Sequence, residues 1–258
     1  MTSHSSWYES EIKRRIDRLH ELIDEAAYNN DSLSAMNIIY QIEALELMSD
    51  EVKFVLARCG DSSKLQNQKT RIETCAFARG LMVLKPLFLA IGITDDEMVG
   101  SISTIGLIDR HGNEFFRKLV SSAKPSSEHC QSDDFHRRGT NHKPFEWQEI
   151  WQETRQKVAD RFLVIFNASS KLNLIRRACN KNHLPVGIRD VEVFCARELF
   201  TRYMGDKLKG DLPDSAMLME VQKLIGELDY NKPNVIERAD IVRRMVNFMV
   251  AEINTLIV

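Results

Sequence analysis

The sequence predicts an all-α protein, a multi-helix bundle made of two helical halves joined by a polar loop. Apolar residues recur at steps of three and four along most of the 258-residue chain, which is the spacing of one helix face. Alternating apolar and polar runs of strand length are scarce, and the sequence contains no Asn-Gly or Asp-Gly hairpin turn. A chain of this length can bury a substantial core, as one domain or as two small ones.

Three long helices are expected in the N-terminal half. The first follows the apolar spacing of Ile12–Ala26 and ends at the polar residues 29–31. The second covers Ile38–Leu56, where isoleucines, leucines and valines recur at helical spacing. The third runs from about Leu65 to Ile91 and is expected to kink near Pro86, because proline removes a backbone donor.

The most apolar run of the chain, Gly80–Ile93, is interpreted as a buried core helix. It is shorter than a membrane span and contains a lysine and a proline, so no membrane partner is expected. Thr94 and Glu97 form a capping-box pair that predicts a short helix. Another short helix is expected over Asn113–Ala123.

The C-terminal half shows the same helical spacing. The expected helices are Trp147–Phe166, Lys171–Asn180, Val191–Met204, Ser215–Leu228 and a last apolar helix capped by Asn234 with Glu237 and extending past Ile253. The aromatic residues Trp147, Trp151, Phe162 and Phe166 share one helical stripe, which predicts a core-facing role. Trp7 and Tyr8 precede the first predicted helix, and we expect them to pack back onto it; docking onto a neighbouring chain is the alternative.

A polar gap separates the two helical patterns. It divides the chain into an N-terminal half (1–120), a connector (121–146) and a C-terminal half (147–258). The gap contains ligand-type side chains, namely His129, Cys130, Asp133, Asp134, His136 and His142. A folded loop could gather four of them around zinc, but their spacing matches no familiar zinc module. The composition favours a solvated connector, so no metal site is expected.

Charge and cysteine usage exclude several classes of protein. The formal net charge is −2, with 15 basic and 18 acidic residues before Pro125 and 20 and 19 after it, so neither half is strongly basic. The five cysteines are widely separated, which argues against a disulfide framework and favours a cytoplasmic location. The N-terminus carries no secretory-signal pattern. The sequence also lacks a glycine-rich phosphate loop, a GxSxG elbow and an HExxH motif, and no cofactor is expected.

One basic cluster could contact nucleic acid. It consists of Lys171, Arg176, Arg177, Lys181, His183 and Arg189, with a break at residues 185–187 that imitates the turn of a helix-turn-helix. The proline in that turn is unusual for the motif, and charge runs usually mark a solvated helix face. RNA or DNA is therefore an alternative partner to another protein.

Two Arg-to-His pairs, Arg137 with His142 and Arg177 with His183, resemble the short motif of the helical-bundle ribonucleases called HEPN domains. The resemblance implies that the histidine acts on the 2′-hydroxyl and that the arginine stabilises the phosphate charge. The family favours a polar residue after the arginine and places the motif on a helix. In this chain Arg138 and Ala178 follow the two arginines, and Arg137 falls in the polar gap.

These observations favour a non-enzymatic interaction protein: an adaptor, a regulator or an assembly subunit that binds another protein or a second copy of itself. No catalytic residue is assigned. The ten methionines, several of them in the last two predicted helices, would suit adaptable apolar contacts, or they could fill the core. A nucleic-acid-binding regulator or nucleocapsid-type subunit is the first alternative, and a HEPN-like ribonuclease is the second.

Overall fold

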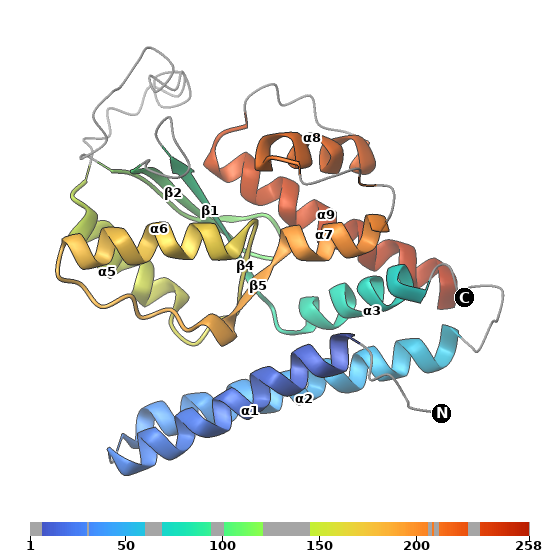
Figure 1. The fold of residues 1–258 in the computed structure, drawn as a ribbon, viewed down its shortest axis with the longest axis horizontal. Coiled ribbons are helices and arrows are strands. Elements are labelled where there is room, and N and C mark those ends of the chain that lie inside the picture. The colour runs from blue at the N-terminus through green and yellow to red at the C-terminus, as the bar shows by residue number, and fades with distance from the viewer. Residues whose placement is uncertain are drawn as a thin grey trace. The chain divides into compact units, whose positions relative to one another are not determined.

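The computed structural model describes residues 7–29, 31–59, 69–93, 101–120, 145–205, 208, 212–226 and 233–257. It shows an α/β fold with a five-stranded mixed sheet and helices (Figure 1). The prediction of an all-α helical bundle is therefore wrong. The chain divides into two compact units. The helical unit comprises Met1–Pro86, Glu198–Leu212 and Met245–Val258, and the sheet unit comprises Leu87–Arg197 and Pro213–Arg244.

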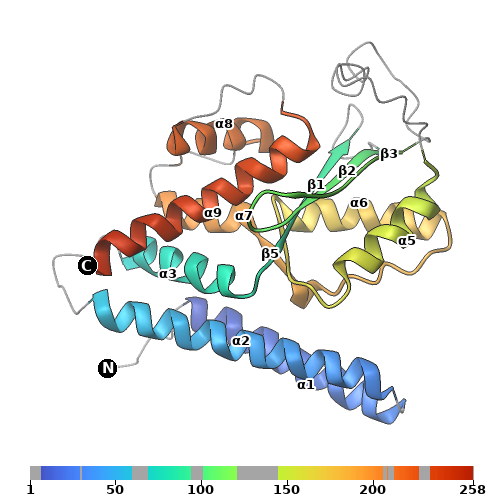
Figure 2. The same cartoon turned by 180° about the vertical axis from the view of Figure 1, so that it is seen from behind.

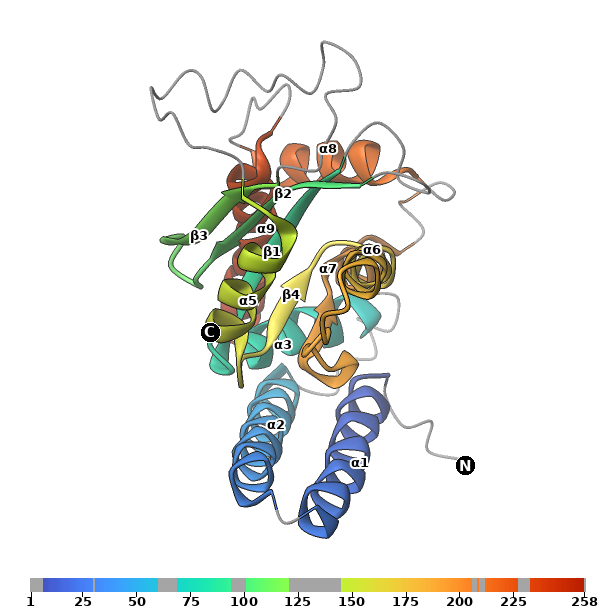
Figure 3. The same cartoon turned by 90° about the vertical axis from the view of Figure 1, so that its left-hand side faces the viewer.

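The helical unit is built on a hairpin of two long helices, α1 (Trp7–Tyr28) and α2 (Ser32–Cys59). They lie side by side and are joined by a short turn (Figure 3). Asp31 caps α2, because its carboxylate accepts hydrogen bonds from the backbone N–H and the hydroxyl of Ser34, at 3.0 and 2.6 Å. α3 (Lys69–Val83), most of α7 (Ala196–Met204) and the end of α9 (Val235–Ile257) complete this unit.

Trp7 is the first residue of α1 and does not precede it as predicted, and its ring packs within the helical unit against α3 and not onto its own helix. Its ring lies 5.0 Å from the ring of Phe77 on α3, and the guanidinium of Arg202 lies 4.0 Å above it. Tyr8 is buried. On α3, Gly80 allows a close approach to α2, since a Cβ built there would lie 2.8 Å from Val52.

The sheet unit contains five strands in the order β3-β2-β1-β4-β5. The strands are β1 (Leu87–Ile93), β2 (Ile102–Ile108), β3 (Glu114–Leu119), β4 (Leu163–Ile165) and β5 (Val193–Cys195). β1, β2 and β3 form an antiparallel meander, whereas β4 runs parallel to β1 and β5 parallel to β4. Figure 2 shows β1 to β3 side by side at one end of the sheet.

The run Gly80–Ile93 is not a single helix, as the sequence had predicted. α3 ends at Val83, Lys85 adopts a left-handed backbone (φ 50°), and Pro86 lacks the amide hydrogen that a helix needs. β1 then begins at Leu87, between β2 and β4. A central strand buried on both faces carries a continuous apolar run, and this run imitated a buried helix.

Three other helix predictions required correction. The described part of the segment predicted as helix 113–123 contains β3, and β2 was not predicted at all. The segment 147–166 is helical only as α5 (Trp147–Val158), and its last part is β4. The segment 191–204 begins with a short 3₁₀ turn and β5 before α7. The short helix expected after Thr94 lies outside the described residues.

One face of the sheet packs against α5 and α6 (Ala168–Lys181). Leu89 and Ile165 from the strands share one buried cluster with Trp151 of α5 and Ile175 of α6. Trp147 and Trp151 are buried in this core, as their helical spacing predicted, and their rings stack at 5.3 Å. Phe162 and Phe166 are also buried, but they lie beyond the end of α5 and do not share its stripe. The indole N–H of Trp151 donates to the carbonyls of residues 185 and 186, both at 3.1 Å.

The other face of the sheet meets the beginning of α9. Gly106 of β2 faces Val235 and Ile236, and a Cβ at this glycine would lie 2.9 Å from both. The predicted cap of α9 is confirmed: the side chain of Asn234 accepts from the N–H of Glu237, and the Glu237 carboxylate accepts from the N–H of Asn234. α8 (Asp214–Ile225) also belongs to this unit.

Candidate functional site

The most unusual surface of the described chain is the outer side of α2. The helix is apolar on two sides, whereas a surface helix normally has one apolar stripe and one polar face. Its inner side is buried in the helical unit through Ile38, Ile42, Leu45, Met48, Val52 and Val55. Its outer side exposes six large apolar residues, which we call the α2 face: Leu33, Met36, Ile39, Tyr40, Leu47 and Phe54.

Four residues of the α2 face follow each other at intervals of seven. Leu33, Tyr40, Leu47 and Phe54 are 71%, 61%, 58% and 50% exposed. Seven residues make almost two helical turns, so these side chains form a line along the helix. A helix–helix seam is apolar at two positions of each heptad. This line supplies one of them, and Met36, Glu43 and Asp50 occupy the positions three residues further on.

The apolar area of the α2 face is large for a monomer. Large apolar side chains present about 150–250 Å² when fully exposed, so the exposed fractions correspond to roughly 650 Å². The largest apolar patch on a typical monomer is about 300–600 Å², and one side of a standard protein interface buries about 800 Å² in total. The α2 face therefore has the size of one half of a protein interface.

The neighbouring helix α1 provides an internal comparison. Its exposed side carries charged residues, among them Lys13, Arg14, Asp17, Arg18 and Glu21. Three of these form ion pairs on the surface of the helix: Arg14 pairs with Glu11, and Arg18 pairs with Glu21. The apolar outer side is thus a property of α2 and not of the hairpin as a whole.

Four charged residues accompany the apolar line on α2. Glu43, Glu46, Asp50 and Lys53 are exposed, and Asp50 pairs with Lys53 at 3.8 Å. The first half of the helix carries four of the six apolar residues, and three of the four charges lie in the second half. Any partner helix must therefore match an apolar end and a mixed end.

In the sheet unit, the predicted basic cluster is largely paired with acids of the same chain. Lys171 is buried and lies 3.6 Å from Asp214, and Arg176 lies 2.5 Å from Asp190. Arg189 pairs with Glu192. Lys171 is thus held in the fold, whereas the Arg176 pair is exposed and weak; the three pairs together reduce the net positive charge of this surface.

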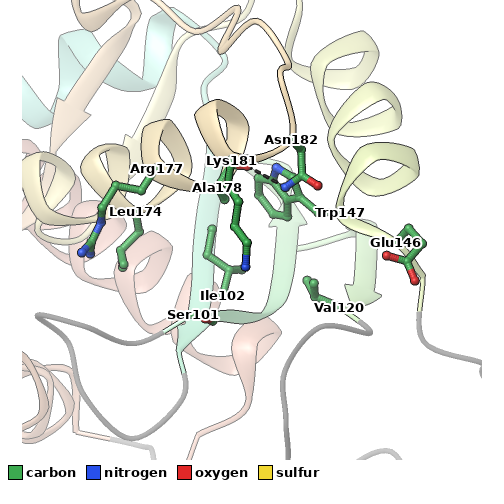
Figure 4. Close-up of a pocket in the computed structure, with 10 residues that line it drawn as sticks. All are labelled: Ser101, Ile102, Val120, Glu146, Trp147, Leu174, Arg177, Ala178, Lys181 and Asn182. Carbon is green, nitrogen blue, oxygen red and sulfur yellow. Dashed lines mark hydrogen bonds between the residues drawn. The ribbon is translucent and has the colours of Figure 1, made fainter.

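Two other members of the cluster line a pocket of about 250 Å³ (Figure 4). Arg177 and Lys181 extend from α6, and Glu146 lies at the rim next to α5. The remaining lining residues are Ser101, Ile102, Val120, Trp147, Leu174, Ala178 and Asn182. The pocket is therefore small and mixed in charge. His183, the sixth member of the cluster, is exposed, follows α6 with φ 53° and is not among the residues that line it.

A buried ionic cluster lies at the carboxyl ends of β4 and β5. Asn167 and Lys171 follow β4, Arg197 follows β5, and Asp214 begins α8. The carboxylate of Asp214 accepts from Arg197 at 2.8 Å and from the Asn167 amide at 3.0 and 3.1 Å. This edge is where open α/β sheets usually bind ligands. In this chain internal ion pairs fill that position around Asp214.

Cys179 of α6 carries a buried thiol within the apolar core of the sheet unit. Burial raises its pKa from 9.0 to about 11. The thiol is therefore protonated at neutral pH and is a poor nucleophile.

The structure describes one of the two predicted ribonuclease pairs and none of the predicted metal-ligand residues of the polar gap. The gap residues His129, Cys130, Asp133, Asp134, His136 and His142, and with them the pair Arg137 and His142, lie outside the described residues. Within the described ranges, no three His, Cys, Asp or Glu side chains are grouped so that they could hold a metal ion. None of the helices in that part of the chain combines the length and apolar content that a bilayer crossing requires.

No protein-family model matches the chain, and no curated protein shows significant sequence similarity to it.

The α2 face was not predicted from the sequence. Ile39 and Leu47 were grouped with the buried residues of the same helix, because steps of three and four connect both sides. The seven-residue spacing from Leu33 to Phe54 was the available signal. Asp214 was also missed, since its partners lie at least 17 positions away in the sequence.

Proposed function

We propose that the protein is a non-enzymatic adaptor, regulator or assembly subunit that acts through protein–protein contacts made by the α2 face. One observation carries the proposal: a line of large apolar side chains on the outer side of a long helix, with heptad spacing and the area of half an interface. Exposing this surface to water costs free energy, and a bound helix recovers it.

Nucleic-acid binding is less well supported. Lys171, Arg176 and Arg189 have acidic partners within the chain, so they cannot neutralise phosphates without breaking those pairs. The ribonuclease alternative has one pair in the described residues, Arg177 and His183. Only Arg177 of that pair lines the pocket.

We also propose a cytoplasmic location. Cys75, Cys179 and Cys195 form no disulfide with one another, and the first two are buried. Reduced thiols are typical of cytoplasmic proteins.

The proposal is tested by site-specific photo-cross-linking in the cells that produce the protein. A photoreactive phenylalanine analogue replaces Tyr40 on the α2 face, and in a matched control it replaces His20 on the charged side of α1. We expect one discrete cross-linked protein from position 40 and none from position 20. The product should disappear when Leu47→Glu is added. If position 40 yields no discrete product, or if Leu47→Glu leaves it unchanged, the α2 face is not a binding surface.

A further inference from the structure

We infer that the partner of the α2 face is a second copy of this chain, bound so that the two α2 helices run antiparallel. This inference rests on the proposed function, because it names the occupant of the same surface. The area of the face fits such a partner: two copies of a face of roughly 650 Å² bury about as much apolar surface as a stable dimer needs.

The apolar line on α2 is symmetric about its own centre. An isologous dimer needs a surface that is complementary to itself. If the twofold axis passes between Glu43 and Ala44, Leu33 lies level with Phe54 of the second copy. Tyr40 then lies level with Leu47 of the second copy. All four heptad residues find an apolar partner in this register.

The charges on α2 select the antiparallel direction. In a parallel pair, Glu43, Glu46 and Asp50 would each lie beside the same acid of the second copy. In the antiparallel pair, Asp50 lies level with Asn37 and Lys53 with Ser34. Antiparallel helices also align their dipoles favourably. Glu43 lies next to Glu43 of the second copy at the axis, and Glu46 lies level with Gln41 of the second copy, within one helical turn of its Glu43.

The remaining sides of α2 are already packed against α1 and α3 within the helical unit. The two hairpins of the dimer would therefore associate through α2 alone, and the buried cores need not rearrange. Rigid surfaces of this kind associate without a large ordering cost.

The test combines molar mass with the mapping of cross-links on the purified full chain. We expect light scattering to give twice the monomer mass of 29.7 kDa at micromolar concentration. Tyr40→Glu with Leu47→Glu should raise the dimer dissociation constant by at least about 100-fold, because it buries charges at the seam. His20→Glu should leave the mass unchanged. Circular dichroism of each variant shows whether the fold is retained.

Cross-link positions distinguish the two directions. A photoreactive residue at position 33 should attach to peptides around Phe54, and one at position 40 to peptides around Leu47. In a parallel dimer, positions 33 and 40 would instead attach to their own counterparts, and the antiparallel arrangement would be wrong. If light scattering shows that the wild-type protein is a monomer, the partner of the α2 face is not a second copy of this chain. If position 40 still captures a different protein in cells, the proposed function stands without it; if it captures none, both fail.

Discussion

Asp214 joins segments of the sheet unit that lie far apart in the sequence. Its carboxylate accepts hydrogen bonds from Arg197 and Asn167 and forms an ion pair with Lys171. Both Asp214 and Lys171 are buried. A buried carboxylate is tolerated only when its partners satisfy it, and removing it would leave two cations in a poorly solvated site. The cluster therefore holds α8 and the first turns of α6 and α7 to the carboxyl edge of the sheet.

We expect Asp214→Asn to lower the free energy of unfolding by about 3 kcal/mol, because it breaks a buried ionic cluster. The matched control is Asp190→Asn. The pair of Asp190 with Arg176 is exposed, and its loss should cost less than about 1 kcal/mol. Urea unfolding of both variants provides the measurement. Equal losses at the two sites would show that the Asp214 cluster does not stabilise the fold.

The buried thiol of Cys179 predicts a pH dependence of stability at the residue scale. Its pKa is raised from 9.0 in the unfolded chain to about 11 in the fold, because burial disfavours the thiolate. The folded state then holds a proton that the unfolded state loses between about pH 9 and 11. Stability from this group is fully present below pH 9 and declines as the pH rises to 11.

The measurement is the difference in unfolding free energy between the wild-type protein and Cys179→Ala. We expect the difference to be constant from pH 6 to 8 and to shrink between pH 9 and 11. A difference that stays constant up to pH 11 would mean that the thiol titrates alike in the folded and unfolded chains.

At the scale of elements, the sequence predicted most helices but not the sheet. Helical spacing located α1, α2, α6, α8 and α9, and the Asn234 cap of α9 was predicted residue by residue. β1 was misassigned because a strand buried on both faces is apolar throughout, like a buried helix. β4 and β5 have three residues each, too few to show alternation, and their place in the sheet depends on pairing with distant segments.

The candidate site shows the same limit. The sequence identified Arg177 and Lys181, which do line a pocket, but it could not show that Asp214 and Glu192 neutralise other members of the basic cluster. Those acids approach through tertiary packing or a local turn. The heptad line on α2 was visible in sequence, but its exposure was not, since only the packing of α1 and α3 shows which side is covered.

The contact between α2 and α3 depends on the absence of a side chain at Gly80. A larger residue there would collide with Val52 and with the backbone of Met48, whose carbonyl oxygen lies 3.1 Å from the position of a Cβ. We expect Gly80→Leu to lower the unfolding free energy by about 2 kcal/mol, despite the better helix propensity of leucine. Ala27→Leu, at an exposed position of α1, is the control and should change stability by less than about 0.5 kcal/mol. Unchanged stability of Gly80→Leu would mean that the two helices separate at little cost.

Glu43 provides a prediction for the pairing of two α2 helices. In the antiparallel dimer the two copies of Glu43 lie on either side of the twofold axis, where like charges repel. Glu43→Gln should therefore tighten the dimer several-fold, as measured by sedimentation at a series of concentrations. Glu25→Gln, on the exposed side of α1, should have no effect. A weaker dimer in Glu43→Gln would place the axis elsewhere.

At the scale of the whole molecule, the chain passes repeatedly between its two units. The helical unit uses Met1–Pro86, Glu198–Leu212 and Met245–Val258, and both α7 and α9 carry residues of each unit. Within the helical unit, Arg71 of α3 reaches Tyr203 of α7 and Glu252 of α9, each at 2.5 Å. Segments from the beginning, the middle and the end of the chain are thus needed to hold the unit that presents the α2 face.

This dependence links dimer formation to the stability of the whole fold. If two copies bind through the α2 face, the dimer binds the folded state and not the unfolded chain, so mass action stabilises it. We expect the Tm of the wild-type protein to rise by several degrees as its concentration increases from about 1 to about 100 µM. For Leu47→Glu the Tm should be independent of concentration, because this variant keeps the fold and loses the seam. His20→Glu should behave like the wild-type protein. Calorimetry of the three proteins at three concentrations provides the measurement. A wild-type Tm that does not change with concentration would mean that self-association does not stabilise the fold.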